Sequence, residues 1–109
     1  MNTEKVLGFF QEITRIPRES GHEEKIVAYL QQFAAARGLE CKTDKIGNVM
    51  IAKPASKGYE NRPAVVLQGH TDMVCEKKST SNFDFSKDPI HYVIENGWMI
   101  AHDTTLGAD

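Results

Sequence analysis

The sequence predicts an α/β protein, and three observations support this prediction. Two amphipathic helical segments come first, the apolar pattern then changes to the alternation of strands, and a short uninterrupted apolar run follows. Such an order is expected to give a layer of helices on a sheet, with only part of that sheet present in this chain. The 109 residues have the length of one domain, with a formal net charge of −2 and 40% hydrophobic residues. This composition excludes a disordered chain and offers no basic surface for nucleic acid.

The two helices are marked by their apolar stripes and by their ends. In the first, Val6, Phe10 and Ile13 recur at helical spacing, Asn2 or Thr3 can cap the start, and Pro17 stops the helix. The second is expected to begin with a capping box, in which the side chains of Ser20 and Glu23 each bind a free backbone N–H of the first turn. Its apolar face includes Ile26, Leu30 and Phe33, and Arg37-Gly38 marks its end.

Five strands are predicted after the helices. The first two are joined by a turn-rich stretch, the third is the apolar run, and the last two flank an Asn-Gly pair that is typical of a tight hairpin turn. In order, they are Leu39–Thr43, Val49–Lys53, Ala64–Leu67, Ile90–Ile94 and Trp98–His102. Residues 79–88 are predicted to form a polar loop whose Phe83 and Phe85 dock on the domain.

The most informative chemistry directly follows the third predicted strand, where His70 and Asp72 are separated by one residue. In open α/β sheets, ligands gather at the carboxyl ends of strands. In extended backbone the two side chains point to the same face. A metal-binding histidine needs its other ring nitrogen held, commonly by a carboxylate, and Asp72 is placed to do this. On the residues alone, the alternative of two surface side chains with no common task remains open.

A second candidate ligand is Asp109, which follows Gly107-Ala108. Aspartate oxygens suit zinc and can bridge two ions, although taken alone this residue reads as an aspartate in a turn. Cys41 and Cys75 show no metal-binding spacing and are expected to be free intracellular thiols. No apolar run reaches the ~20 residues of a membrane span, so a cytoplasmic protein without membrane partners is expected.

Four motifs then suggest a family. They are Ile16-Pro17, Ser20-Gly21-His22-Glu23-Glu24, Ile46-Gly47-Asn48 and Leu67-Gln68-Gly69-His70-Thr71-Asp72-Met73-Val74. In this order they resemble the amino-terminal part of the M20-type dizinc metallopeptidases. Residues 83–90 and 104–109 resemble, within that group, the aminoacyl-histidine dipeptidases (Xaa-His dipeptidase, peptidase D). The resemblance covers essentially the whole chain.

This resemblance implies the α/β catalytic domain of a zinc peptidase, with two helices and a mixed sheet that includes a β-hairpin. It implies two zinc ions as cofactors, with cobalt or manganese as substitutes, and His70 and Asp109 as metal ligands. Asp72 would belong to the catalytic residues by holding His70 in its metal-binding tautomer, and Asp109 would bridge the ions. The implied reaction is the hydrolysis of small dipeptides that end in histidine, such as β-alanyl-histidine. A metal-activated water would carry it out in a cytoplasmic homodimer.

The resemblance also implies that residues 1–109 are only the amino-terminal segment of that catalytic domain. The family's glutamate base, remaining ligands and lid or dimerisation domain have no counterpart in this sequence. Because a catalytic zinc takes about three protein ligands plus water, the segment by itself is expected to be inactive. Two alternatives remain open: a natural non-catalytic module that self-associates or binds a partner, and an M20-type acylamino-acid amidohydrolase.

Overall fold

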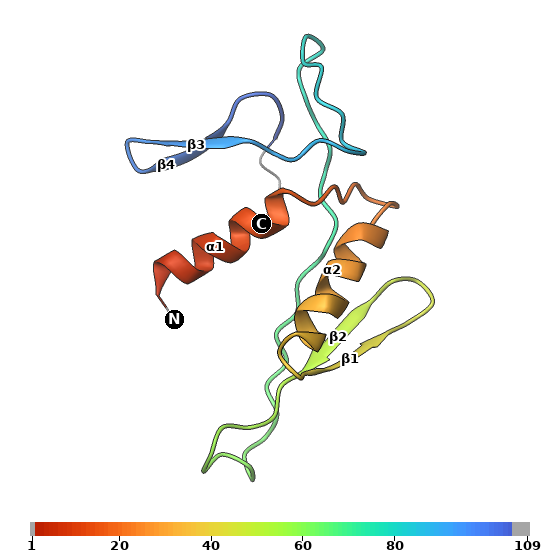
Figure 1. Cartoon of the computed structure of the whole chain (residues 1–109), viewed down its shortest axis with the longest axis vertical. Helices are drawn as coiled ribbons and strands as arrows, with labels where there is room; N and C mark the ends of the chain where they lie inside the picture. Colours follow the sequence, from red (N-terminus) through yellow and green to blue (C-terminus); the bar gives the residue numbers. More distant parts are fainter. Residues whose placement is uncertain (1, 106–109) are drawn as a thin grey trace.

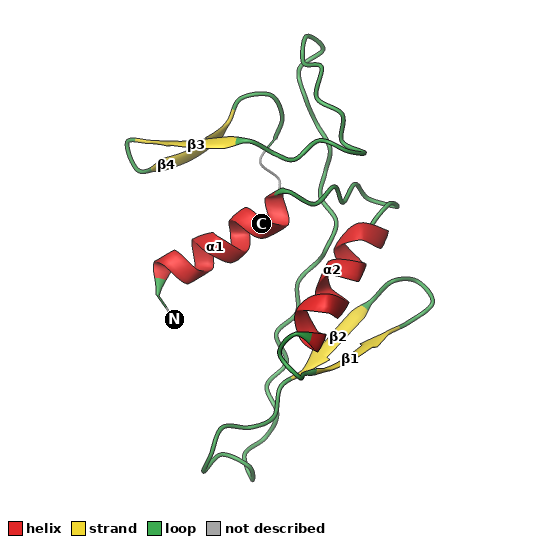
Figure 2. Ribbon diagram, viewed as in Figure 1, coloured by secondary structure: helices red, strands yellow, loops and turns green. Residues whose placement is uncertain are grey.

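The computed structural model describes residues 2–105, and Figure 1 shows their arrangement. The elements, in chain order, are α1 (Thr3–Thr14), α2 (Glu24–Ala35), β1 (Glu40–Thr43), β2 (Val49–Ala52), β3 (Tyr92–Glu95) and β4 (Trp98–Ala101). β1 pairs with β2 and β3 pairs with β4, both antiparallel, so the described strands form two separate two-stranded sheets. The first hairpin packs against α2, and Figure 2 shows how much of the remaining chain is loop.

Helix α1 is formed and bounded as its sequence predicts. The side chain of Asn2 accepts a hydrogen bond from the backbone N–H of Lys5 at 3.0 Å, which satisfies one of the free donors of the first turn. The helix ends at Thr14, before Pro17. Its apolar stripe makes two aromatic contacts: Phe9 meets Phe33 of α2 at 5.6 Å between ring centroids, and Phe10 meets Tyr92 of β3 at 6.0 Å. The apolar stripe of α1 therefore packs against both α2 and β3.

Helix α2 begins later than the sequence predicts, and the expected capping box is wrong. The helix starts at Glu24, and its N-cap residue, Glu23, makes no side-chain capping bond. The carboxylate of Glu23 instead accepts from the N–H of Gly21 at 2.7 Å, while the Ser20 hydroxyl binds Asp72. A tertiary partner has thus replaced the local one. The predicted end is confirmed, because Gly38 has a φ of 62° just past the helix.

Both predicted hairpins are confirmed. In the first, the Asp44 carboxylate accepts from the N–H groups of Ile46 and Asn48, which closes the turn between β1 and β2. In the second, Asn96 and Gly97 have φ values of 51° and 81° and connect β3 directly to β4. Left-handed backbone at both central residues is what a two-residue turn needs to match the twist of its strands.

The predicted strand Ala64–Leu67 is not formed, and residues 2–105 do not make a single mixed sheet. Val65, Val66 and Leu67 are 84%, 86% and 93% exposed. A strand buried on both faces needs layers on both sides, and the described residues provide neither a neighbouring strand nor a covering helix for this run. Among residues 2–105, parallel pairing is limited to an isolated bridge between Glu19 and Met73.

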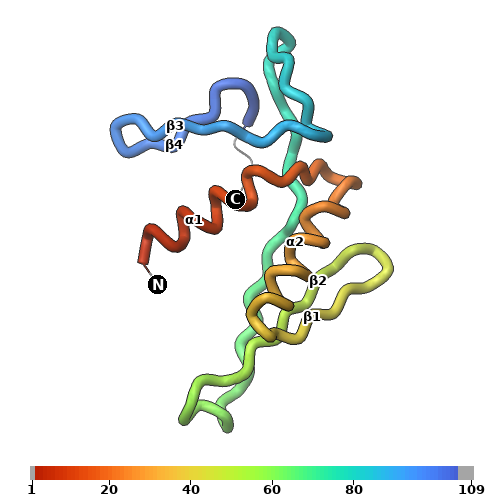
Figure 3. Tube along the Cα trace, in the orientation of Figure 1, coloured from red at the N-terminus to blue at the C-terminus, as the bar shows by residue number. Residues whose placement is uncertain are grey.

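The hydrophobic core is small. Among residues 2–105, the buried hydrophobic side chains are Ile26, Ala34, Met73 and Ile90. The radius of gyration is 16.4 Å, whereas a compact domain of this length has about 13 Å. Residues 53–91 connect the two hairpins over much of the molecule's length, as the tube in Figure 3 shows. Phe83 and Phe85, expected to dock, are half-buried and pack on each other with ring centroids 4.9 Å apart.

Candidate metal centre

The segment with His70 and Asp72 is held in place by the chain just before α2. The N–H of Met73 donates to the carbonyl of Arg18 at 3.0 Å, beside the bridge between Glu19 and Met73. The guanidinium of Arg18 donates to the carbonyl of Thr71 at 3.3 Å. Arg18 and Met73 are both buried, with 4% of their surface exposed. A buried guanidinium bound to a backbone carbonyl is costly to displace, so this clamp fixes residues 71–73 against residues 18–19.

The structure brings His70 and Asp72 together, as their spacing predicts. The ring Nδ1 of His70 lies 3.0 Å from Asp72 Oδ1 and 2.9 Å from the backbone oxygen of Asp72. The carbonyl oxygen can only accept, so Nδ1 carries the proton. With Nδ1 engaged in this way, Nε2 is the ring nitrogen that would hold a metal. The two side chains are 56% and 36% exposed, which leaves the pair accessible from solvent.

A third residue, Ser20, completes this arrangement. Its hydroxyl donates to Asp72 Oδ2 at 2.5 Å. This hydrogen bond, followed by the one with His70, holds the pKa of the Asp72 carboxyl below its usual value, because both partners favour the charged form. Asp72 is therefore a carboxylate with one oxygen on a hydroxyl and the other on an imidazole. Sequence patterns assigned Ser20 to a helix cap, and its partner lies 52 residues away in the chain.

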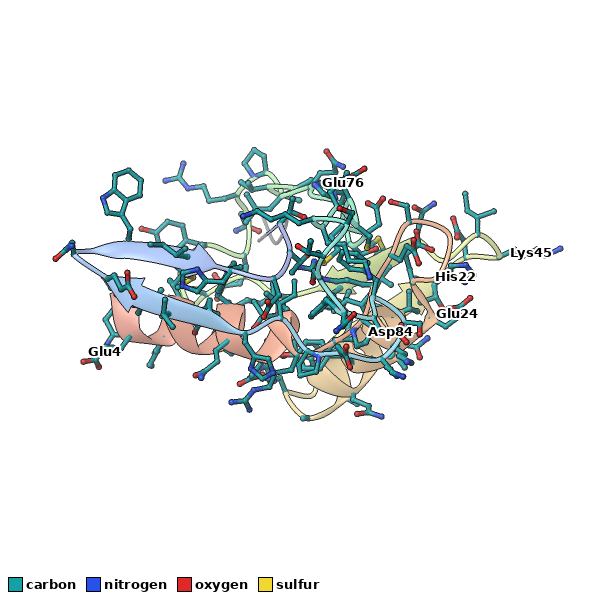
Figure 4. All side chains as sticks on the ribbon, turned by 90° about the horizontal axis from the view of Figure 1, so that it is seen from above. Glu4, His22, Glu24, Lys45, Glu76 and Asp84 are labelled. Carbon is teal, nitrogen blue, oxygen red and sulfur yellow. The ribbon has the colours of Figure 1, made fainter. Side chains whose placement is uncertain are left out.

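An open cleft of about 850 Å³ borders the pair. Its walls come from α2, from the turn between β1 and β2, and from residues 68–72. Its lining includes charged residues of both signs, among them Glu24 from the start of α2 and Lys45 from the turn, and Figure 4 shows these two at the same end of the molecule. Gly47, also in the lining, has a φ of 91°. The cleft thus provides room for a small polar ligand beside His70.

The donor chemistry at this place fits one metal ligand, not a complete site. His70 has the carboxylate partner that metal-binding histidines use. Within residues 2–105, however, no group of three His, Cys, Asp or Glu side chains is arranged to hold a metal ion. Asp109, the second predicted ligand, lies outside the described residues. Cys41 and Cys75 are free thiols, as expected, and both are half-buried.

Comparisons with known proteins find similarity to two dipeptidases. The chain is 46% identical over 100 residues to the cytosol non-specific dipeptidase of Escherichia coli K12, a match that covers 92% of this chain. The structure resembles the crystal structure of aminoacylhistidine dipeptidase from Vibrio alginolyticus, with a TM-score of 0.94, 42% identity and coverage of the whole chain. The chain is thus similar, in sequence and in structure, to part of two dipeptidases. No family model matches its sequence.

The similarity to these dipeptidases confirms the resemblance predicted from the motifs, and it confirms the partial α/β fold class. The chain spans about a fifth of the length of each relative, 21% of the Escherichia coli protein and 22% of the Vibrio alginolyticus chain. Helices long and apolar enough to cross a membrane do not occur among the described residues.

Proposed function

We propose that the protein, at its natural length, is a cytosolic metallo-dipeptidase that hydrolyses Xaa-His dipeptides such as β-alanyl-histidine. The observation that carries the proposal is the His70–Asp72 pair beside an open cleft. It lies in a fold that matches an aminoacylhistidine dipeptidase with a TM-score of 0.94. The similarity to a cytosol non-specific dipeptidase supports both the dipeptide substrate class and the compartment. A small peptide is also what a cleft of about 850 Å³ can admit.

His70 and Asp109 are the metal ligands of this proposal, and two zinc ions are the metals. His70 would hold one ion through Nε2, Asp72 would keep the proton on Nδ1, and Asp109 would be a ligand of both ions. When bound, zinc polarises the scissile carbonyl and acidifies a water molecule. The role of this chain is to orient the imidazole of His70 and to line the cleft that admits the peptide.

Residues 1–109 form, in this proposal, the amino-terminal segment of the catalytic domain. The general base, the remaining ligands and a lid or dimerisation domain belong to the rest of a homodimeric protein. A catalytic zinc takes about three protein ligands plus water, so residues 1–109 alone are inactive.

One observation favours a different function, a module that pairs with a second copy of itself. Residues 65–67 are apolar and exposed, and they pair with no strand in the described part. The third alternative, an acylamino-acid amidohydrolase, shares the metal chemistry and differs in substrate. Because both relatives are named dipeptidases, the dipeptidase is preferred over these two.

The proposal is tested with the purified natural-length protein. It should release histidine from β-alanyl-histidine, lose this activity to a chelator and regain it with zinc, while residues 1–109 alone should be inactive. Hydrolysis of N-acetyl amino acids without dipeptide hydrolysis would replace the dipeptidase by the amidohydrolase. Absence of any hydrolysis, together with concentration-dependent dimerisation in size-exclusion chromatography, would favour the self-associating module.

A further inference from the structure

The Ser20 hydroxyl is used in a way that neither the helix nor the metal chemistry requires. It lies 2.5 Å from Asp72 Oδ2 and 3.5 Å from the carbonyl of Met73. A serine has one hydroxyl proton, and the shorter, charge-assisted contact takes it. Ser20 sits four residues before α2 and makes no helix cap. Its hydroxyl instead binds the carboxylate of the His70–Asp72 pair.

We propose that Ser20 is a positioning residue for the metal centre: its hydroxyl fixes the Asp72 carboxylate so that Oδ1 faces Nδ1 of His70. This inference rests on the proposed function, which it deepens. Asp72 alone can turn about its side-chain bonds and still meet His70 part of the time. With Oδ2 on Ser20 and Oδ1 on His70, both oxygens are engaged and one orientation remains.

Backbone contacts around Ser20 hold its side chain next to Asp72. The hydrogen bond from the Met73 N–H to the Arg18 carbonyl and the bridge between Glu19 and Met73 fix the two chain segments on either side of it. The buried guanidinium of Arg18 adds a bond to Thr71. Ser20 therefore meets Asp72 across a rigid junction, although both side chains are accessible to solvent.

Replacing Ser20 should affect zinc binding through Asp72. Removing the partner that orients a metal-binding histidine costs about 10–100-fold in affinity, and Ser20 acts one step further from the metal. Ser20→Ala should therefore raise the Kd for zinc about three- to tenfold. Ser20→Thr keeps the hydroxyl and should stay within about twofold of the wild type. In an Asp72→Ala background, Ser20→Ala should have no further effect, because the group that it positions is gone.

The experiment titrates the natural-length protein with zinc against a competing chelator. It compares Ser20→Ala, Ser20→Thr, Asp72→Ala and the double variant with Ser86→Ala. Ser86 donates to Asp84 at 2.6 Å in another exposed Ser–Asp pair, so it controls for the loss of such a bond outside the site. Crystal structures of the metal-free wild type and Ser20→Ala give a second readout, the separation of His70 Nδ1 and Asp72 Oδ1. Thermal unfolding checks that all variants fold.

The expected result is a weaker zinc affinity in Ser20→Ala but not in Ser20→Thr or Ser86→Ala, with a displaced Asp72 carboxylate in Ser20→Ala and no extra effect on top of Asp72→Ala. Unchanged affinity and an unmoved carboxylate in Ser20→Ala would overturn the role of Ser20. A wild type that binds no zinc would instead overturn the proposed function. The metal-free structures would still decide whether Ser20 holds Asp72.

Discussion

Replacing Asp72 by alanine tests how this chain holds its predicted metal ligand. Loss of a carboxylate that orients a metal-binding histidine costs about 10–100-fold in metal affinity. Here the imidazole Nδ1 has two acceptors, Asp72 Oδ1 at 3.0 Å and the backbone oxygen of the same residue at 2.9 Å. The backbone oxygen survives the substitution and can only accept, so the proton stays on Nδ1. The loss in zinc affinity should therefore lie at the lower limit, about tenfold.

Competition titration of the natural-length protein with zinc measures this loss. Asp72→Asn should lose less than Asp72→Ala, because the amide oxygen can still accept from the imidazole although the charge is gone. Asp84→Ala is the control, since Asp84 is a carboxylate whose partners are Ser86 and Lys87 rather than the site. A loss of more than about 100-fold would show that the backbone oxygen does not hold the ring. An unchanged affinity would show that Asp72 does not act on the metal at all.

Three further predictions concern the fold. Ile26→Ala should lower the free energy of unfolding by about 2–5 kcal/mol in urea denaturation, because this side chain is 3% exposed. Ile46→Ala should change it by less than about 0.5 kcal/mol, because Ile46 is 86% exposed; equal effects would contradict the assigned core. Gly97→Ala, at a φ of 81°, should cost about 1–2 kcal/mol in the same assay, and a neutral result would refute the left-handed turn. The Ser86 hydroxyl and N–H hold the pKa of Asp84 at about 2, so their contacts should persist at pH 4 and disappear as the pH falls through about 2. Carbon-13 NMR of the carboxyl group measures this, and titration near 3.8 would contradict it.

The sequence predicted the features that depend on neighbours in the chain. The Asn2 cap, the glycine that ends α2 and the Asn96-Gly97 turn all act within a few residues, and all are present in the structure. The His70–Asp72 contact belongs to the same group, because only one residue separates the two in the chain. The metal-ligand roles of His70 and Asp109 remain predictions.

The features that sequence patterns missed depend on partners far along the chain. Ser20 and Glu23 have the spacing of a capping box, but α2 begins only at Glu24, and the Ser20 hydroxyl donates to a carboxylate 52 residues away. A hydrogen bond to a charged acceptor is stronger than one between neutral groups, which favours this tertiary contact. The run Ala64–Leu67 has the composition of a buried strand, yet its burial depends on layers that no local pattern can supply.

By itself, the sequence determined the helices, the two hairpins, the pairing of His70 with Asp72 and the likeness to the dipeptidases. These follow from short-range backbone geometry and from ordered motifs. Only the tertiary structure decided that Arg18 and Met73 join the two segments of the site, that Ser20 holds Asp72, and that the cleft opens beside His70. The physical reason is that these contacts exchange local hydrogen-bond partners for distant ones, and their outcome is set by burial and charge at the place where the chain segments meet.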